Sequence, residues 1–339
     1  MFIDTIVSMA EARMRIAILD DYQSVALSMA DWSVLPAGVE VVSFRDHLHD
    51  EDALVARLEG FDAISRMRER TEFPRRVLER LPRLKLLLAT GRRNSDTIDL
   101  AAATELGITV CSTASIPCFP VELTWGLVLA LFRRIPFEHA AVQGGGWQSG
   151  LGRGLNGRTL GVVGLGTIGL PVARIGQAFG MEVIAWSRNL TAERAAEAGV
   201  ARVSKEELLE RSDAVTLHVP LTPESTHLIG EAELARMKSD AYLINTSRGP
   251  LIDEAALVRA LKGRRIGGAG LDVFDVEPLP AEHPLRGLDN AVLTPHIGYV
   301  TEDNYRIYFT QTVENIQAYL AGKPMRVLMP GDKVLNFAH

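Results

Sequence analysis

Residues 160–169 read LGVVGLGTIG, an apolar run that ends in the spacing G-x-G-x-x-G. A helical pattern follows, so the three glycines lie between an expected strand and an expected helix. In such a turn the first glycine permits a tight bend, the second lets a diphosphate approach the backbone, and the third lets the helix pack closely on its strand. Amides at the helix start then face the phosphates. The flanking pattern disfavours a ligand-free turn, and we predict a dinucleotide-binding turn formed by Gly164, Leu165, Gly166, Thr167, Ile168 and Gly169.

The composition is that of a globular protein: 339 residues, 47% hydrophobic, 23% charged, with a net charge of −6. The length suffices for two packed domains, and the acidic balance disfavours nucleic acid as a partner. No apolar stretch reaches transmembrane length and the first residues do not resemble a secretory signal, so we expect a cytoplasmic protein without a membrane partner. Cys111 and Cys118 lack zinc or disulfide spacing, and we expect both to be small buried residues. His47 and His49 are expected on a solvated face, and no metal site is predicted.

Two series of alternating strand and helix patterns run along the chain. The first has strands at residues 14–19, 39–44, 63–65, 84–89 and 108–111, with helices such as 52–58 and 97–106. A long apolar helix at 122–135 and a glycine-rich turn at 144–147 connect it to the next series. The second starts at Thr159 and continues with strands at residues 182–186, 214–219, 242–245, 268–271 and 291–293. A helix at 302–320 and an extended end at 323–330 follow. This alternation predicts an α/β fold with two doubly wound, parallel-sheet domains.

The cofactor choice depends on the end of the strand that follows the glycine turn. Dinucleotide folds usually carry an acid there, which binds the adenosine ribose. This chain instead has Ser187, Arg188 and Asn189. A hydroxyl beside a guanidinium can bind a 2′-phosphate, which an acid would repel, so NADPH is the preferred cofactor and NADH a possible one. The alternative for Arg188 is a solvated arginine that stacks on the adenine.

Three segments at expected strand ends each carry one residue suited to chemistry: TSRG at 246–249, DVFDVEP at 272–278 and PHIG at 295–298. Arg248 can hold a carboxylate in a fork and polarise the neighbouring carbonyl. His296 can donate a proton to the oxygen that becomes a hydroxyl. Glu277 can accept a hydrogen bond from the other imidazole nitrogen and stabilise the protonated ring. Singly, each residue also fits a surface ion pair, a solvated acid or a core histidine.

Together, and in this order after the glycine motif, these segments resemble the D-isomer-specific 2-hydroxyacid dehydrogenases over nearly the whole chain. The resemblance implies a flavodoxin-like substrate domain built from both chain ends, residues 1–111 and 300–339, with a Rossmann cofactor domain, residues 112–299, inserted between them. It gives Arg248 the role of substrate arginine, His296 that of acid/base and Glu277 that of the acid that orients the histidine. It implies that Asp272 binds the nicotinamide carboxamide and that the further cofactor contacts come from His218, Val219, Pro220, Thr226, Thr246, Ser247 and Gly298.

The first domain departs from the family pattern. TGRRNS at residues 90–95 stands where many relatives have a glycine-rich substrate loop, and RMRERT at 66–71 follows the preceding strand. These arginines would either bind a second anionic group of the substrate or form surface ion pairs with the acidic bulk. The expected substrate contacts are Arg68, Gly91, Arg92, Arg248, His296 and Tyr299.

The expected function is that of a 2-oxo acid reductase of the glyoxylate or hydroxypyruvate type, which forms a D-2-hydroxy acid. A formate dehydrogenase-like relative is one alternative, although that branch pairs its histidine with glutamine. A phosphoglycerate dehydrogenase of the long type would need a regulatory domain after residue 339. A non-catalytic, corepressor-like dinucleotide sensor is an alternative from another class. The family also implies a homodimer, with residues 122–135 and 144–147 as the contact surface.

Overall fold

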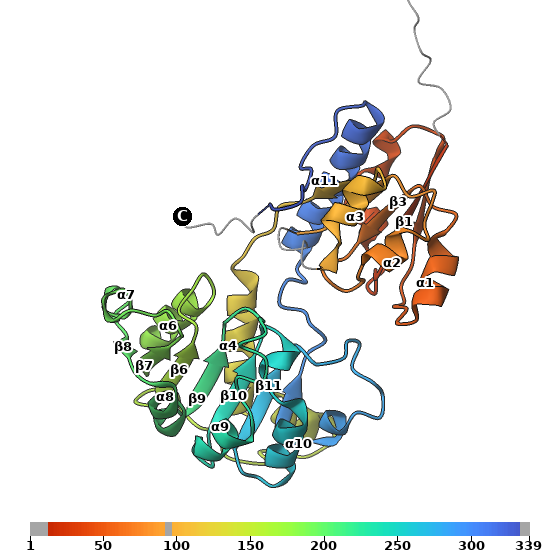
Figure 1. Ribbon diagram of the computed structural model, residues 1–339. Helices are drawn as coiled ribbons and strands as arrows, with labels where there is room; N and C mark the ends of the chain where they lie inside the picture. The colour runs from red at the N-terminus through yellow and green to blue at the C-terminus, as the bar shows by residue number, and fades with distance from the viewer. Residues whose placement is uncertain (1–12, 92–96, 333–339) are drawn as a thin grey trace, which may run out of the picture. The chain divides into compact units, whose positions relative to one another are not determined.

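The computed structural model describes residues 13–91 and 97–332, and the chain divides into two compact units (Figure 1). The first unit comprises residues 1–116 and 301–339, and the second comprises residues 117–300. The boundary between the first and second units follows Ile116, whereas the sequence predicts it after Cys111. Residues 112–116 belong to the first unit because helix α11 (Glu302–Leu320) binds them. Asn315 Nδ2 donates to the Ser112 carbonyl at 2.9 Å, and Asn304 Oδ1 accepts from the Ile116 amide at 2.9 Å.

The first unit is built on a five-stranded parallel sheet in the order β2-β1-β3-β4-β5. Its strands are β1 (Met14–Ile18), β2 (Val39–Ser43), β3 (Ala63–Arg66), β4 (Leu86–Ala89) and β5 (Thr109–Ser112). Side chains alternate between two cores: one packs against α1 (Glu51–Leu58), α2 (Arg75–Leu78) and α3 (Leu100–Glu105), and the other against α11. The strand order is that of flavodoxin-like folds.

The second unit has a seven-stranded parallel sheet in the order β12-β11-β10-β9-β6-β7-β8. Its strands are β6 (Thr159–Val163), β7 (Glu182–Trp186), β8 (Ala201–Arg202), β9 (Ala214–Leu217), β10 (Tyr242–Asn245), β11 (Gly268–Leu271) and β12 (Ala291–Leu293). The chain starts at central β6, runs outward through β7 and β8, and then returns to add β9 to β12 on the other side. This is the doubly wound Rossmann order, and its switch point lies beside β6.

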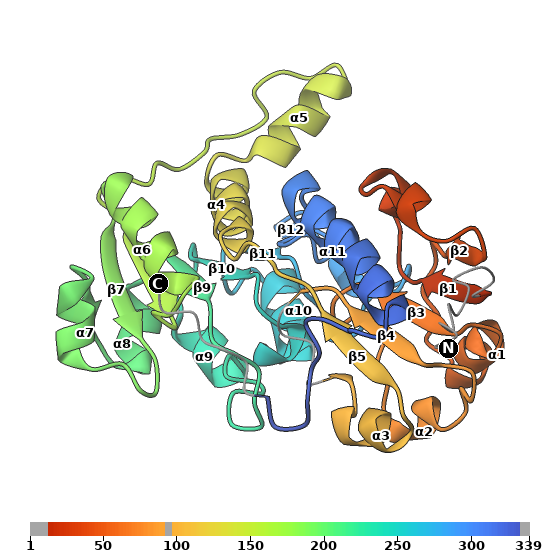
Figure 2. The same ribbon diagram turned by 90° about the horizontal axis from the view of Figure 1, so that it is seen from above.

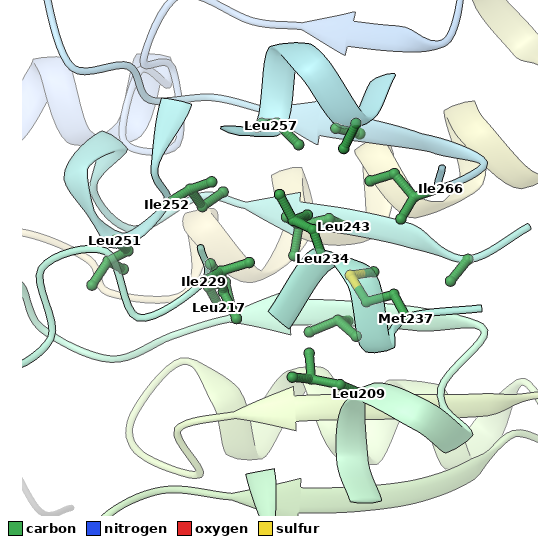
Figure 3. Close-up of a cluster of buried hydrophobic side chains, with 14 of the residues drawn as sticks. Leu209, Leu217, Ile229, Leu234, Met237, Leu243, Leu251, Ile252, Leu257 and Ile266 are labelled. Atoms are coloured by element: carbon green, nitrogen blue, oxygen red, sulfur yellow. The ribbon is translucent and has the colours of Figure 1, made fainter. Parts of the chain in front are cut away.

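Helices cover both faces of the second sheet (Figure 1). One face carries α4 (Phe119–Phe132) and α6 (Gly169–Ala178), and the other carries α8 (Lys205–Arg211), α9 (Glu231–Arg236) and α10 (Glu254–Lys262). The small helix α7 (Ala192–Glu197) lies between β7 and β8 in the chain. Figure 3 shows the hydrophobic core between the second sheet and helices α8 to α10. In it Leu209 of α8, Leu234 of α9 and Leu257 of α10 surround Leu217 and Leu243 of the sheet. The predicted fold class, a Rossmann unit inserted into a flavodoxin-like one, is confirmed.

The predicted single helix at residues 122–135 is wrong in its extent. Helix α4 ends at Phe132, and a separate helix α5 (Ile135–Gln143) begins after Arg134, whose φ is +55°. Pro136 has no amide hydrogen to donate to the Phe132 carbonyl, so the helix cannot continue through it. The Arg153 amide donates to that carbonyl instead, at 2.6 Å.

Other expectations shift by a few residues. Helix α3 begins at Leu100 rather than 97 because Asp99 caps it, accepting a hydrogen bond from the Ala102 amide at 2.8 Å. Strand β4 begins at Leu86 and β9 ends at Leu217, whereas the strands at 182–186, 242–245, 268–271 and 291–293 and the helix at 302–320 are as predicted. The two-residue strand β8 was not predicted, because so short a strand shows no periodic pattern.

The cysteines and histidines lie only partly where the sequence predicts them. Cys111 is buried as expected, but Cys118 is exposed at the start of α4. His47 does not lie on a solvated face, because its side chain is largely buried and its Nδ1 lies 2.8 Å from Asp20 Oδ1, whereas His49 is exposed. Within residues 13–91 and 97–332, no helix combines the length and apolarity needed to span a bilayer, and no three metal-ligating side chains gather.

Candidate functional site

The candidate site lies at the carboxyl edge of the second sheet. All seven strands are parallel, so the loops that follow β6, β7, β9, β10, β11 and β12 leave from the same edge. Open α/β sheets bind ligands at this edge, beside the switch point. Every site residue that the sequence predicts in the second unit is in one of these loops or, for Gly169, at the start of the helix after β6.

The glycine turn has the geometry that its spacing predicts. Gly164 has φ +98°, and a Cβ there would lie 2.9 Å from the backbone carbonyl of His218. A Cβ at Gly169, the first residue of α6, would overlap the Gly164 carbonyl oxygen. Gly166 differs, since no described atom lies within 4 Å of the position of an added Cβ. Two glycines thus allow the backbone to close, while the middle one leaves open space of the kind a diphosphate needs.

The loops after β7 and β9 lie next to this turn and are tied together. Arg188 is exposed, and its Nη2 donates to the Glu224 carbonyl at 3.0 Å. Ser187 is partly exposed and Asn189 exposed. Thr226 Oγ1 donates to the Thr222 carbonyl at 3.0 Å within the second loop, where Pro220 is exposed. The guanidinium therefore bridges the two loops at the place where the sequence predicts an adenosine ribose.

His218 as a whole is partly exposed, but one of its ring nitrogens is buried. Its Nε2 is buried and has no hydrogen-bond partner among the described residues. Burial lowers the pKa of His218 to about 3, so the ring is neutral at physiological pH. The adjacent Val219 carbonyl accepts from Ser247 Oγ at 2.7 Å, and Thr246 Oγ1 lies 2.8 Å from Thr124 Oγ1. A neutral ring with an unsatisfied nitrogen beside the glycine turn fits a wall that contacts a bound dinucleotide.

Glu277 and His296 form a direct pair. His296 Nδ1 lies 2.5 Å from Glu277 Oε2, and both side chains are largely buried. The other carboxylate oxygen, Oε1, accepts from the Phe274 amide at 2.9 Å, which sets the plane of the carboxylate. The Tyr299 ring stands edge-on to the imidazole with centroids 5.6 Å apart. Because Nδ1 faces a carboxylate, Nε2 is the ring nitrogen that can exchange a proton with a ligand.

Asp272 holds the turn that carries His296. Its Oδ1 accepts from Thr294 Oγ1 at 2.6 Å and from the Ile297 amide at 2.8 Å, and its Oδ2 accepts from the Gly298 amide at 2.9 Å. Burial, opposed by these hydrogen bonds, raises the pKa of Asp272. The carboxylate thus binds the Thr294 hydroxyl before His296 and two backbone amides after it, and the φ of His296 is +53°. This support, in addition to the predicted cofactor contact, was not foreseen from the sequence.

The loop that carries Arg248 packs, through Gly249, on the segment that carries Glu277. A Cβ at Gly249 would overlap the Phe274 carbonyl, so this backbone packs directly on the segment that holds Glu277. Asn245, at the end of β10, fixes the turn: its Nδ2 donates to the Arg248 carbonyl at 2.8 Å and its Oδ1 accepts from the Ser247 amide at 3.0 Å. Sequence reasoning missed Asn245, although an asparagine at a strand end is a known turn signal.

The arginines of the first unit are held by internal contacts. Arg66 is fully buried and donates to the Thr71 carbonyl at 2.7 Å, and burial lowers its pKa to about 9. Arg68 Nε lies 3.3 Å from Glu69 Oε2, and its guanidinium lies against Gly91. Arg70 Nη1 donates to the Asp20 carbonyl at 3.2 Å. Neither alternative weighed for these loops fits Arg66, which is not on the surface; Arg92 lies outside the described residues.

Comparison with known proteins agrees with the resemblance. The family model described as "D-isomer specific 2-hydroxyacid dehydrogenase, NAD binding domain" matches residues 125–298. A glyoxylate reductase of Aeropyrum pernix is 42% identical over 259 residues, covering 73% of this chain and 76% of the relative. A D-3-phosphoglycerate dehydrogenase of Methanocaldococcus jannaschii is 40% identical over 277 residues, 80% of this chain and 52% of the relative, so this chain spans about half the length of that protein.

A solved structure extends the likeness to both units. The phosphoglycerate oxidoreductase from Vibrio cholerae o395 is 36% identical and superposes with a TM-score of 0.85, covering 91% of this chain and 99% of that one. Glycine turn, arginine, glutamate and histidine occur here in the predicted order and at one edge of one sheet. The chain belongs to the D-isomer specific 2-hydroxyacid dehydrogenase family.

Proposed function

We propose that this protein reduces a small 2-oxo acid to a D-2-hydroxy acid with a nicotinamide dinucleotide, in the manner of a glyoxylate or hydroxypyruvate reductase. The observation that carries the proposal is the 2.5 Å pair of Glu277 and His296, which follows strands of the same sheet as the glycine turn. A non-catalytic sensor has no use for such a proton donor. Formate oxidation leaves no alkoxide to protonate, so it does not need one either.

In the proposed mechanism the reduced nicotinamide, when bound, supplies a hydride. Gly164 to Gly169 and the α6 amides would hold its diphosphate, with His218, Val219, Pro220, Thr226, Thr246, Ser247, Asp272 and Gly298 as further contacts. His296 Nε2 donates a proton to the substrate oxygen as that oxygen gains charge. The Glu277 carboxylate stabilises the protonated ring and keeps Nε2 directed away from itself. Arg248 holds the substrate carboxylate and increases the positive character of the carbonyl carbon.

The substrate class follows the named relatives, which include a glyoxylate reductase. We place cofactor binding in the second unit and expect Arg68, Gly91 and Arg92 of the first unit, and Tyr299 of the second, to contact substrate. Initial rates with glyoxylate, hydroxypyruvate, pyruvate and a bulky aromatic 2-oxo acid test this assignment. Comparable rates with the aromatic acid would contradict a small-substrate site.

The acid–base role is tested by His296→Gln, which retains polarity but cannot cycle a proton. We expect turnover of 2-oxo acids to fall at least about a thousandfold, within the range for loss of a general acid, while the dissociation constant for the dinucleotide changes less than threefold. Fluorescence titration gives the affinity and stopped-flow absorbance gives the rate. Activity equal to that of the wild type would remove His296 from the mechanism.

We infer that NADPH is the preferred dinucleotide. Support comes from the exposed Arg188 guanidinium beside Ser187, where an acid would otherwise bind the ribose. Arg188→Ala is expected to weaken NADPH binding about tenfold, by loss of a charge-assisted contact, and to leave NADH binding within twofold. Tighter binding of NADH than of NADPH by the wild type would overturn this preference.

We also propose a homodimer that forms through the second unit. The contact surface expected from the sequence comprises residues 122–135 and 144–147, and in α4 the residues Glu122 and Gly126 are exposed while seven others are buried. Figure 2 shows α5 and the following loop standing off from the rest of that unit. No residue of α5 is buried, Trp147 is 77% exposed and Leu151 96%. Such exposed apolar groups are typical of an interface, and sedimentation of the double variant Trp147→Ser, Leu151→Ser is expected to yield monomers.

A further inference from the structure

Another carboxylate–histidine pair binds the chain on either side of Glu277. Glu254, the first residue of α10, has Oε1 at 3.0 Å from His283 Nε2. The two side chains are only 19% and 18% exposed. His283 Nδ1 accepts from the Leu285 amide at 3.4 Å, so Nε2 carries the hydrogen that is donated to Glu254.

The same carboxylate also binds the chain before Glu277. Glu254 Oε2 accepts from the Asp275 amide at 3.3 Å. One side chain of α10 therefore binds both ends of segment 275–283, and Glu277 lies between those ends. We refer to Glu254 and His283 as the clamp.

The middle of the segment is held from the helical turn that follows it. Arg286 Nη2 donates to the Leu279 carbonyl at 2.6 Å, and its Nε donates to the Pro280 carbonyl at 2.8 Å. The His283 amide also donates to the Pro280 carbonyl, at 3.1 Å. The clamp adds contacts at Asp275 and His283, outside the two carbonyls that the Arg286 guanidinium binds.

The position of this segment determines the position of the Glu277 carboxylate. Glu277 is two residues from Asp275, and its Oε1 accepts from the Phe274 amide, the residue before Asp275. A shift of the Phe274–Asp275 backbone therefore moves both the carboxylate and its donor. Because proton transfer depends on placement within a few tenths of an ångström, a displacement of about 1 Å costs up to about a hundredfold in rate.

We propose that Glu254 and His283 are positioning residues that hold Glu277 against His296. The inference rests on the proposed function. Neither residue is assigned to contact substrate or cofactor; both act through the segment that they hold.

The test compares Glu254→Ala with Glu254→Gln, which retains one oxygen acceptor. Glu231→Ala is the matched control, because Glu231 is the first residue of α9 and pairs with Arg259 at 2.9 Å, with its side chain 80% exposed. The first readout needs no dinucleotide: the proton NMR signal of the His296 Nδ1–H bound to Glu277, assigned by its loss in His296→Gln. The second is the separation of kcat from KM for glyoxylate.

We expect Glu254→Ala to broaden or shift that signal upfield and to lower kcat about tenfold or more while KM changes less than threefold, as for misplaced catalytic groups. Glu254→Gln should restore part of the NMR signal and part of kcat, and Glu231→Ala should change neither the signal nor kcat. If Glu254→Ala does not fold, we expect His283→Gln and Glu254→Gln to show a smaller shift of the NMR signal and a smaller fall in kcat. An unchanged signal and kcat in the folded variants would overturn the inference, even if their melting temperatures fall. If the wild type shows no 2-oxo acid reduction, the proposed function fails while the NMR signal still decides the clamp.

Discussion

At the scale of single residues, His218 couples stability to pH. Its pKa is lowered to about 3 by burial, whereas an unfolded histidine binds its proton near 6.5. Between these values the unfolded state holds more protons, so the stabilising contribution of the neutral ring is complete above pH 6.5 and is lost as the pH falls toward 3. The neutral, partly unsatisfied ring thus makes the protein sensitive to mild acid.

His218→Gln should reduce that sensitivity. Between pH 7 and pH 5 the free energy of unfolding of the wild type should fall by about 1–2 kcal/mol more than that of the variant, as proton linkage requires. Urea unfolding followed by fluorescence at the two pH values measures the difference. The exposed His49, replaced by Gln, is the control and should behave like the wild type. Equal pH dependence in His218→Gln and wild type would contradict the assignment.

The two cysteines differ in reactivity at the same scale. Burial raises the pKa of the Cys111 thiol to about 11, so it carries almost no thiolate at pH 8, whereas Cys118 is exposed. The native protein should therefore show one fast thiol toward an aromatic disulfide reagent, and two in denaturant. Cys118→Ser should abolish the fast reaction. Two fast thiols in the native protein would show that Cys111 is accessible.

At the scale of elements, the site is assembled by close backbone contact between loops. Gly249 follows Arg248 and packs on Phe274 so tightly that an added Cβ would overlap the Phe274 carbonyl and lie 2.6 Å from the Asp275 nitrogen. The loop after β10 and the loop after β11 therefore pack directly on each other at Gly249 and Phe274.

Gly249→Ala tests that packing. The two loops must separate to admit the methyl group, which should lower the free energy of unfolding by about 2–3 kcal/mol, in the range for overpacking. Misplacement of Arg248 and Glu277 should lower kcat at least about tenfold. Gly287→Ala is the control, because nothing lies within 4 Å of its added Cβ. Wild-type kcat in Gly249→Ala would show that the contact does not position the site.

At the scale of the whole molecule, α11 fixes where the first unit ends. Four of its side chains, at positions 304, 308, 311 and 315, bind the segment 112–116 along one helical face. Their spacing of three and four residues is that of one side of a helix. The two boundaries between the units accordingly fall after Ile116 and before Thr301.

Gln311→Ala should loosen this attachment locally. Gln311 Oε1 accepts from the Ala114 amide at 2.7 Å, and loss of one such hydrogen bond, about 1 kcal/mol, should speed hydrogen exchange at Ala114 about fivefold. The Ile116 amide, held by Asn304, should keep its protection. Gln317→Ala is the control, since the exposed Gln317 donates to the Val34 carbonyl instead. Unchanged exchange at Ala114 would show that Gln311 does not hold the segment.

Much of the fold and part of the candidate site followed from local patterns. Alternating apolar runs predicted both parallel sheets, because buried parallel strands are short and continuously apolar. The spacing of Gly164, Gly166 and Gly169 predicted the turn, because each position has its own steric requirement. Side-chain chemistry suggested that Glu277 could pair with His296, and the resemblance of their segments to a family favoured that pairing over a solvated acid and a core histidine.

What the sequence alone determined was the order of elements and the identity of the chemically suited side chains, since both depend on residues close together in the chain. Tertiary structure alone decided that His47 pairs with Asp20, that Arg66 is buried, and that the Arg153 amide binds the Phe132 carbonyl left free at the end of α4. It also decided that Glu254 binds both ends of the segment that carries Glu277. The partners in these contacts lie between 20 and 30 residues apart along the chain in most cases, beyond the range over which helix or strand periodicity carries information.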